Sequence, residues 1–344
     1  MQVERQNNFD ALRIFAALMV LYGHSFALAG ELSPGLMGNS VQALGVKVFF
    51  AISGFLIAGS WKRDSNPLRF FWRRSLRIFP ALWIVVLAST FLLGPMFTSL
   101  DFSSYFSSDL IVSYLMNAIF VISFSLPGVF EGNKYPLAVN GSLWSLPAEF
   151  AMYILTPFIV LLGKNRYFAI SVASIVSIGG ALVVSVPHGN SLVFWGNSLY
   201  SLAEVAPFFV SGAFIALGGF GRPNLQLGVA LFAIIISIKF DVAAQQFFLG
   251  MILPYFVLSI ALVDSPLFSG VSRYGDLSYG IYLYGFPVQQ AVSHIFGEDV
   301  RQWHLFWIAC PVVFFLSLAS WHFIEKRALK LKDFNSVSVF GFSR

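Results

Sequence analysis

Ten apolar stretches of about membrane length follow one another along this chain of 344 residues, and they constrain its fold more than any other feature. A bilayer core needs about 20 consecutive apolar residues per helix. Charged residues make up 11% of the chain, against about 25% in soluble domains. We therefore expect an all-α, polytopic membrane protein with about ten transmembrane helices. The expected spans are 9–29, 41–61, 80–100, 143–163, 167–186, 199–220, 225–239, 247–263, 277–296 and 304–324.

One further segment, 109–126, is ambiguous, and the distribution of Lys and Arg decides its place. Cytoplasmic loops of membrane proteins carry the excess of basic residues. With ten spans and both termini cytoplasmic, sixteen of the 21 Lys and Arg lie inside and three in outer loops. If 109–126 also crossed, the split would be ten against nine. The sequence therefore predicts that 109–126 is a re-entrant or interfacial piece on the outer side.

We find no internal repeat and no appended soluble domain, so residues 1–330 are expected to form one membrane domain with a cytoplasmic tail at 331–344. The start, MQVERQNN, lacks the basic region of a cleaved signal peptide. A single cysteine, Cys310, excludes disulfides and thiolate metal sites. The five histidines have no metal-ligand spacing, and we expect no metal. The net charge of +5 follows loop topology and does not indicate nucleic-acid binding.

The first span carries three ionisable residues, Asp10, Arg13 and His24, in an otherwise apolar run. Ionisable groups inside a span are costly and usually face a functional path in the protein interior. At 100° per residue, Arg13 and His24 share one stripe of the helix. Asp10 precedes Arg13 by three residues, within reach of an ion pair. This stripe, about 16 Å long, suits a bound molecule threaded along the helix.

Lys47 and Glu149 are expected at the same depth as His24, in two other spans. Three ionisable groups at one level predict a polar chamber in which His24 is a general base and Glu149 orients its imidazole. The alternative is a structural network of polar groups that fixes helix packing. Further chamber or acceptor candidates are Ser142, Trp144, Ser145, Tyr279 and Tyr282, although the two tyrosines also fit a helix–helix interface.

The segment 62–80 is rich in Arg and aromatic residues, and it is expected at the cytoplasmic mouth together with Arg13. Arg73, Arg74 and Arg77 fall within little more than one helical turn, which makes a guanidinium cluster suited to phosphates. A topology-setting loop with an interfacial aromatic belt, or a site for anionic lipid, would have the same composition. Glu325, near the inner interface, is expected to pair with a nearby Arg rather than to act in catalysis.

Taken together, these segments resemble integral-membrane acyltransferase family 3, the O-acyltransferases that decorate bacterial polysaccharides and related glycans. The resemblance covers nearly the whole chain and lies in several segments in order. These are NNFDALRIFAALMVLYGH, VKVFFAISGFLIAGSW, RFFWRRSLRIFPALW, NGSLWSLPAEFAMY, LSYGIYLYGFPV and FIEKRA.

The resemblance implies acyl transfer from a cytoplasmic acyl-CoA, usually acetyl-CoA, to a sugar hydroxyl on the outer side of a bacterial inner membrane. Acyl-CoA is then a co-substrate, with no bound cofactor, and the partners are the glycan acceptor and membrane lipids. By position, His24 and Arg13 would be the pair needed for activity, Glu149 the acidic residue, and the 73–77 arginines the groups facing the CoA phosphates. The chain departs from the family at Gly285, where a His is frequent. A transporter or flippase for a lipid-linked glycan is the alternative, because it too needs intramembrane charges.

Overall fold

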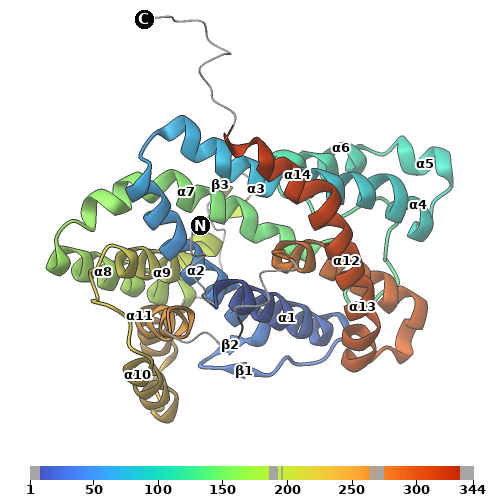
Figure 1. The fold of residues 1–344 in the computed structure, drawn as a ribbon. Coiled ribbons are helices and arrows are strands. Elements are labelled where there is room, and N and C mark those ends of the chain that lie inside the picture. Colours follow the sequence, from blue (N-terminus) through green and yellow to red (C-terminus); the bar gives the residue numbers. More distant parts are fainter. Residues whose placement is uncertain (1–7, 186–192, 195–196, 264–267, 269–274, 334–344) are drawn as a thin grey trace, which may run out of the picture.

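Helices account for nearly all regular structure in the computed structural model, which describes residues 8–185, 193–194, 197–263, 268 and 275–333. Figure 1 shows the helices packed side by side, with two short hairpins between them. The expected all-α membrane fold is confirmed. The helices are α1 Phe9–Leu28, α2 Val41–Arg63, α3 Pro67–Ala88, α4 Gly94–Phe97, α5 Phe102–Phe106, α6 Asp109–Leu115, α7 Ser145–Leu162, α8 Arg166–Ser185, α9 Leu199–Ala216, α10 Leu225–Ser237, α11 Val242–Ala261, α12 Ser278–Phe296, α13 Gln302–Ser320 and α14 Lys326–Leu329. The hairpins pair β1 Gly35–Leu36 with β2 Asn39–Ser40, and β3 Val193–Phe194 with β4 Asn197–Ser198.

Within the described residues, eight helical segments are long and apolar enough to cross a membrane. The other two expected spans correspond to α10, which has only 13 residues, and α12, which carries Gln289 and Gln290. The ambiguous segment forms a helix only over Asp109–Ile119. At 1.5 Å per residue this helix is about 16 Å long, too short for a core of about 30 Å. The segment therefore does not cross as one helix, in agreement with the sequence-based expectation.

The third span begins earlier than predicted, at Pro67 instead of residue 80. The Asn66 side chain accepts a hydrogen bond from the Arg69 backbone N–H at 3.0 Å, and Pro67 occupies the first turn, where it needs no donor partner. Pro80 lies inside the helix, so the prediction that it starts the span was wrong. As a result, the arginines of 62–80 project from a helix instead of a loop.

The second helix, α2, lies at the centre of the bundle and contacts α1, α7, α9 and α11. Its closest neighbour is α9, because Gly54 packs against the Phe209 backbone and Gly212 packs against the Ala51 backbone. Small residues at such crossings let helix backbones approach closely. The π-helical turn Ser89–Leu93 links α3 to α4, and another, Trp321–Glu325, links α13 to α14. The 3-10 turn Lys330–Asp333 continues the chain into the expected tail, whose residues 334–344 lie outside the described part.

Candidate active site

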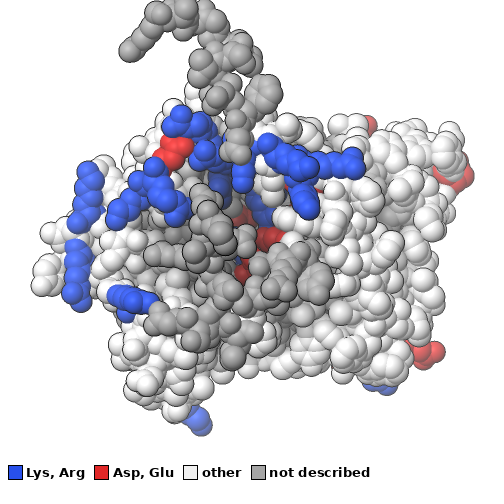
Figure 2. Space-filling model, in the orientation of Figure 1, with Lys and Arg blue, Asp and Glu red and all other residues white. Residues whose placement is uncertain are grey.

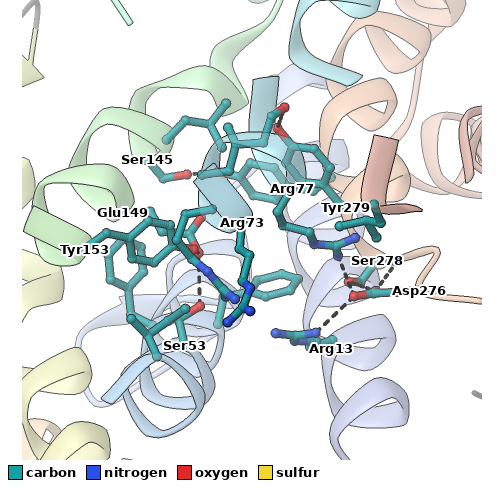
Figure 3. Close-up of a pocket in the computed structure, with 18 of the residues that line it drawn as sticks. Arg13, Ser53, Arg73, Arg77, Ser145, Glu149, Tyr153, Asp276, Ser278 and Tyr279 are labelled. Carbon is teal, nitrogen blue, oxygen red and sulfur yellow. Dashed lines mark hydrogen bonds and ion pairs between the residues drawn. The ribbon is translucent and has the colours of Figure 1, made fainter. Parts of the chain in front are cut away.

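A cavity of about 360 Å³ lies between α1, α2, α3, α7 and α12 (Figure 3). Small-molecule sites commonly have volumes of about 300–1,000 Å³. Five cationic and two acidic side chains line it among the described residues, so the lining is net positive. The cations are Arg13, Arg73, Arg74, Arg77 and Lys332, and the acids are Glu149 and Asp276. The arginines that the sequence places on two separate helices therefore meet at one cavity.

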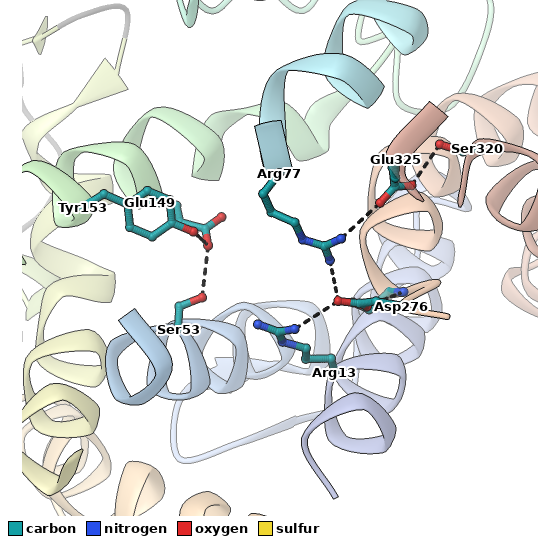
Figure 4. Close-up of polar contacts among 9 residues, drawn as sticks. Arg13, Ser53, Arg77, Glu149, Tyr153, Asp276, Ser320 and Glu325 are labelled. Carbon is teal, nitrogen blue, oxygen red and sulfur yellow. Dashed lines mark hydrogen bonds and ion pairs between the residues drawn. The ribbon is translucent and has the colours of Figure 1, made fainter. Parts of the chain in front are cut away.

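Two of these arginines are held by a chain of ion pairs (Figure 4). Asp276 Oδ2 lies 3.0 Å from Arg13 Nη1 and 2.5 Å from Arg77 Nη2. Arg77 Nη1 also pairs with Glu325 Oε2 at 3.3 Å, and the Ser320 hydroxyl donates to Glu325 at 3.0 Å. The expected pairing of Glu325 with an arginine is confirmed. The expected partner of Arg13 was wrong, because Asp276 forms its ion pair in place of Asp10.

Asp276 precedes α12, and neighbouring charges and hydrogen bonds determine the pKa of its carboxyl group. Burial alone would raise the pKa of this carboxyl, but the charges of Arg77 and Arg13 and the hydrogen bonds from Ser278 hold its pKa at about 2. Asp276 therefore stays ionised and compensates two guanidinium groups at the wall of the cavity.

A carboxyl group with a depressed pKa in the folded state stabilises the fold above its unfolded-state pKa, and this contribution is lost as the pH falls through the folded value. For Asp276 the loss is expected between about pH 4 and about pH 2. The unfolding temperature of the detergent-solubilised protein should fall across this window. In the Asp276→Asn variant this part of the pH dependence should be absent, and an unchanged profile would contradict the assignment.

Arg73 has an acidic partner outside the cavity. Arg73 Nη1 lies 3.1 Å from Asp64 Oδ2, and Arg69 binds the same carboxylate at 2.8 Å. The hydrogen bond from Arg69 holds the pKa of Asp64 at about 2. Arg73 thus has its charge balanced at the exposed start of α3.

Arg74 differs from the other three arginines. Its side chain lines the cavity and forms no ion pair or hydrogen bond with any described residue, and its Nε is buried without a partner. It lies 6.0 Å from the Phe70 ring and interacts electrostatically with Glu149. A buried, unpaired polar atom is rare in native structures and calls for a partner. Among these four arginines, Arg74 therefore has the charge most available to an anionic ligand.

Glu149, from α7, forms the polar wall opposite the Asp276 ion pairs (Figures 3 and 4). Its Oε1 accepts hydrogen bonds from the Ser53 hydroxyl at 3.0 Å and the Tyr153 hydroxyl at 2.5 Å. No hydrogen bond to a described residue reaches the Oε2 atom. Sequence reasoning missed Ser53 and Tyr153, although Tyr153 is four residues from Glu149 and so lies on the same helix face.

Tyr282 and Ser145 line the cavity together with Phe49. The Tyr282 hydroxyl donates to the Ser142 carbonyl at 2.8 Å, so the Ser145 hydroxyl donates to Tyr282 across 2.5 Å. The rings of Phe49 and Tyr282 meet edge to face at 5.9 Å. Tyr279, another lining residue, donates to the Ile78 carbonyl at 2.8 Å and lies 5.5 Å from the Arg77 guanidinium.

His24 is not among the described residues that line this cavity. Its half-buried ring meets Phe286 of α12 edge to face at 5.1 Å and forms no hydrogen bond with a described residue. Glu149, whose hydrogen bonds go to Ser53 and Tyr153, does not orient it. A side chain at Gly285 would meet Leu21, three residues before His24.

The other expected chamber residues lie apart from the cavity lining. Lys47 is buried between α2 and α9, where its ammonium pairs with Glu204 of α9 at 2.9 Å and donates to Asn39. Ser142 is buried, and Trp144 is half-buried against the core. The predicted chamber joining Lys47, His24 and Glu149 at one level is therefore not formed.

The fold defines a membrane protein of many helices, and its candidate site is a cavity with a net positive, arginine-rich lining. A family model described as an acyltransferase domain matches residues 6–322, so the chain belongs to this acyltransferase family. The protein is accordingly an acyltransferase with several membrane-spanning helices.

Curated relatives match over the same range. The chain is 35% identical to an O-acetyl transferase of Shigella phage Sf6, covering 95% of this chain and 97% of the relative. It is 32% identical to nodulation protein 10 of Rhizobium leguminosarum bv. viciae, covering 95% and 94%. The chain is 25% identical to O-acetyltransferase OatA of Staphylococcus aureus, in a match that covers 92% of this chain but 56% of that longer protein. No solved structure matches the chain.

Proposed function

We propose that this protein transfers an acetyl group from cytoplasmic acetyl-CoA to a sugar hydroxyl of a cell-surface glycan, or of its lipid-linked precursor, in a bacterial inner membrane. The observation that carries the proposal is the cavity lined by four arginines together with Glu149, Ser145 and Tyr282. The names of two relatives, both O-acetyl transferases, support the acyl group.

The distribution of basic side chains supports a cytoplasmic donor. Figure 2 shows Lys and Arg gathered on the upper part of the viewed face, over α3 and α14, with others at its left edge, near the turn between α7 and α8. Cytoplasmic surfaces of membrane proteins carry this excess, and acyl-CoA is a cytoplasmic metabolite with several phosphates. Guanidinium groups bind phosphate oxygens in pairs of charge-assisted hydrogen bonds. In this proposal Arg74 binds a donor phosphate first, because Arg13, Arg73 and Arg77 already have acidic partners.

The Arg74→Ala variant is expected to raise the KM for acetyl-CoA about tenfold or more, since a charge-assisted hydrogen bond is worth about 1.5–3 kcal/mol. The kcat should change much less. Arg73→Ala is the matched control, because it removes a neighbouring guanidinium that already pairs with Asp64, and its KM should rise less. The double variant should weaken CoA binding more than it slows chemistry. An unchanged KM for acetyl-CoA in Arg74→Ala would indicate that the arginines of 62–80 set the membrane topology and do not bind the donor.

The transfer itself forms one bond and breaks another. The acceptor hydroxyl oxygen attacks the thioester carbonyl, the carbon–sulfur bond breaks, and CoA leaves as the thiol after taking up the proton. In the proposal His24 accepts the hydroxyl proton as a general base and returns it to the leaving sulfur. Because His24 lies outside the cavity lining, the acyl end of the donor must extend beyond the lining residues to reach it. An acyl-histidine intermediate is the covalent variant of the same step.

Glycan mass spectrometry tests the proposal. Glycans from a deletion strain should lack the mass of one acetyl group per modified sugar, and complementation should restore it. Identical spectra would refute acetyl transfer. The rival, a transporter or flippase for a lipid-linked glycan, does not require CoA. A rise in unfolding temperature on adding CoA to the purified protein therefore favours the enzyme, and transport without an acyl donor favours the rival.

A further inference from the structure

The loop between the η2 turn Met116–Ile119 and α7 is bound tightly to α12. Gln290, which is fully buried, donates from its side-chain amide to the Tyr135 carbonyl at 2.8 Å and to the Ala138 carbonyl at 2.7 Å. Asn133 donates back to the Gln290 side-chain oxygen at 2.7 Å. Asn140, also fully buried, donates to the Leu283 carbonyl at 3.0 Å. With a further bond from Asn133 to the Gln290 backbone carbonyl at 3.0 Å, five hydrogen bonds to one helix fix the position of residues 133–140.

This loop also holds an unusual backbone conformation. Leu137 has a φ of 66°, in the left-handed region that side-chain-bearing residues seldom adopt, and its side chain is exposed. Such strain costs free energy and persists only where the surrounding contacts enforce it, which is common at ligand-binding sites. The carbonyl groups that Gln290 binds lie on either side of Leu137.

The loop presents an aromatic ring next to the candidate base. Tyr135 is 45% exposed, and its ring meets that of Phe286 at 6.1 Å. Phe286 is buried, and its ring also meets the His24 imidazole, at 5.1 Å. Three rings thus run from the surface to His24. The path does not pass through the arginine-lined cavity, because none of the three residues lines it.

Polar groups without partners lie beside the same path. The Ser142 hydroxyl and the Gln289 side-chain oxygen are buried and bind no described residue. Ser142 follows Gly141, which packs on the Phe286 ring, and Gln289 donates to the Leu21 carbonyl, one helical turn before His24. Buried polar groups are nearly always satisfied, so an unpaired acceptor and an unpaired hydroxyl indicate a ligand that bears hydroxyl groups.

We propose that Tyr135 is the stacking platform of an acceptor subsite that binds a pyranose ring, with Phe286 behind it and His24 at its inner end. A sugar has an apolar C–H face, which packs on an exposed tyrosine ring, and a rim of hydroxyl groups, which needs hydrogen-bond partners. The inference deepens the proposed function and rests on it. It gives donor and acceptor separate entrances, one lined by arginines and the other by aromatic rings.

The test uses purified full-length protein, acetyl-CoA, and unacetylated glycan isolated from the deletion strain. Tyr135→Ala is expected to raise the acceptor KM about tenfold while leaving the donor KM and the stabilisation by CoA unchanged. Tyr135→Phe keeps the ring and should restore the acceptor KM to within about threefold of the parent value. Tyr167→Ala is the matched control, because Tyr167 is an exposed tyrosine on α8 with no part in the path.

An unchanged acceptor KM in Tyr135→Ala would overturn the stacking platform and leave the proposed function intact. A parallel loss of CoA stabilisation would also overturn it, because the residue would then be structural. If the parent protein transfers no acetyl group to the glycan, the proposed function itself fails. This failure can be told apart from failure of the stacking platform, because it is seen in the parent protein before any variant is compared.

Discussion

Replacing His24 by Ala is expected to abolish acyl transfer while the protein remains inserted and folded. A positioned general base contributes about 10²–10⁴-fold to a rate, and the imidazole forms no hydrogen bond with any described residue whose loss would unfold the protein. The measurement is the acetyl content of the glycan in cells that express the variant, together with the turnover of purified protein.

His294 provides the matched control for this experiment. Its ring also sits edge to face against an aromatic ring, that of Phe97 at 5.4 Å, and it too lies outside the cavity lining, but it has no contact with Phe286 among the described ring pairs. His294→Ala should therefore retain transfer. Near-parental acetylation by His24→Ala would remove the catalytic assignment, and Glu149, whose Oε2 binds no described residue, would be the next group to test as the base.

The second large effect is expected from Asp276→Asn, which keeps the shape of the side chain and removes its charge. Among the described residues, Arg77 would then keep only Glu325 as an ion-pair partner, and Arg13 would have none. Removing one partner of a buried ion pair typically costs about 3–5 kcal/mol, because the remaining charge is uncompensated. We expect a lower unfolding temperature and a weaker dependence of stability on low pH, both measured by thermal unfolding in detergent.

Asp64→Asn is the control for this variant, since Asp64 also binds two arginines but at the exposed start of α3. Exposed ion pairs contribute little to stability, so its unfolding temperature should stay close to that of the parent. If the two substitutions lowered the unfolding temperature equally, burial would not explain the contribution of the Asp276 ion pairs to stability.

The helical bundle and the arginine cluster of the site could be predicted from the sequence, because both follow from the regular geometry of helices. Spacing along a helix places Arg73, Arg74 and Arg77 on neighbouring faces, and depth from the span ends places them near Arg13. Rise per residue fixes the depth of a side chain, but the direction in which it points depends on how its helix is rotated. Lys47 therefore faces α9, where it pairs with Glu204, instead of His24 or Glu149.

Partners distant in sequence were harder to predict. Asp276 is 263 residues from Arg13, and no periodic pattern relates the two positions. The nearer candidate, Asp10, satisfied the helical spacing rule but not the tertiary arrangement. Glu325 was predicted to pair with an arginine because it sits at the cytoplasmic interface, where an ion pair is a more common role than catalysis.

The Asp276 ion pairs also bear on how the chain is made. Arg13 and Arg77 are synthesised long before Asp276 and Glu325 leave the ribosome. During that interval both guanidinium groups lie in nascent membrane helices without their acidic counterparts, a state that is costly in lipid. Chains that stop before residue 276 consequently keep both charges without these acidic partners, so the membrane helices gain this compensation only when the C-terminal part of the sequence has been made.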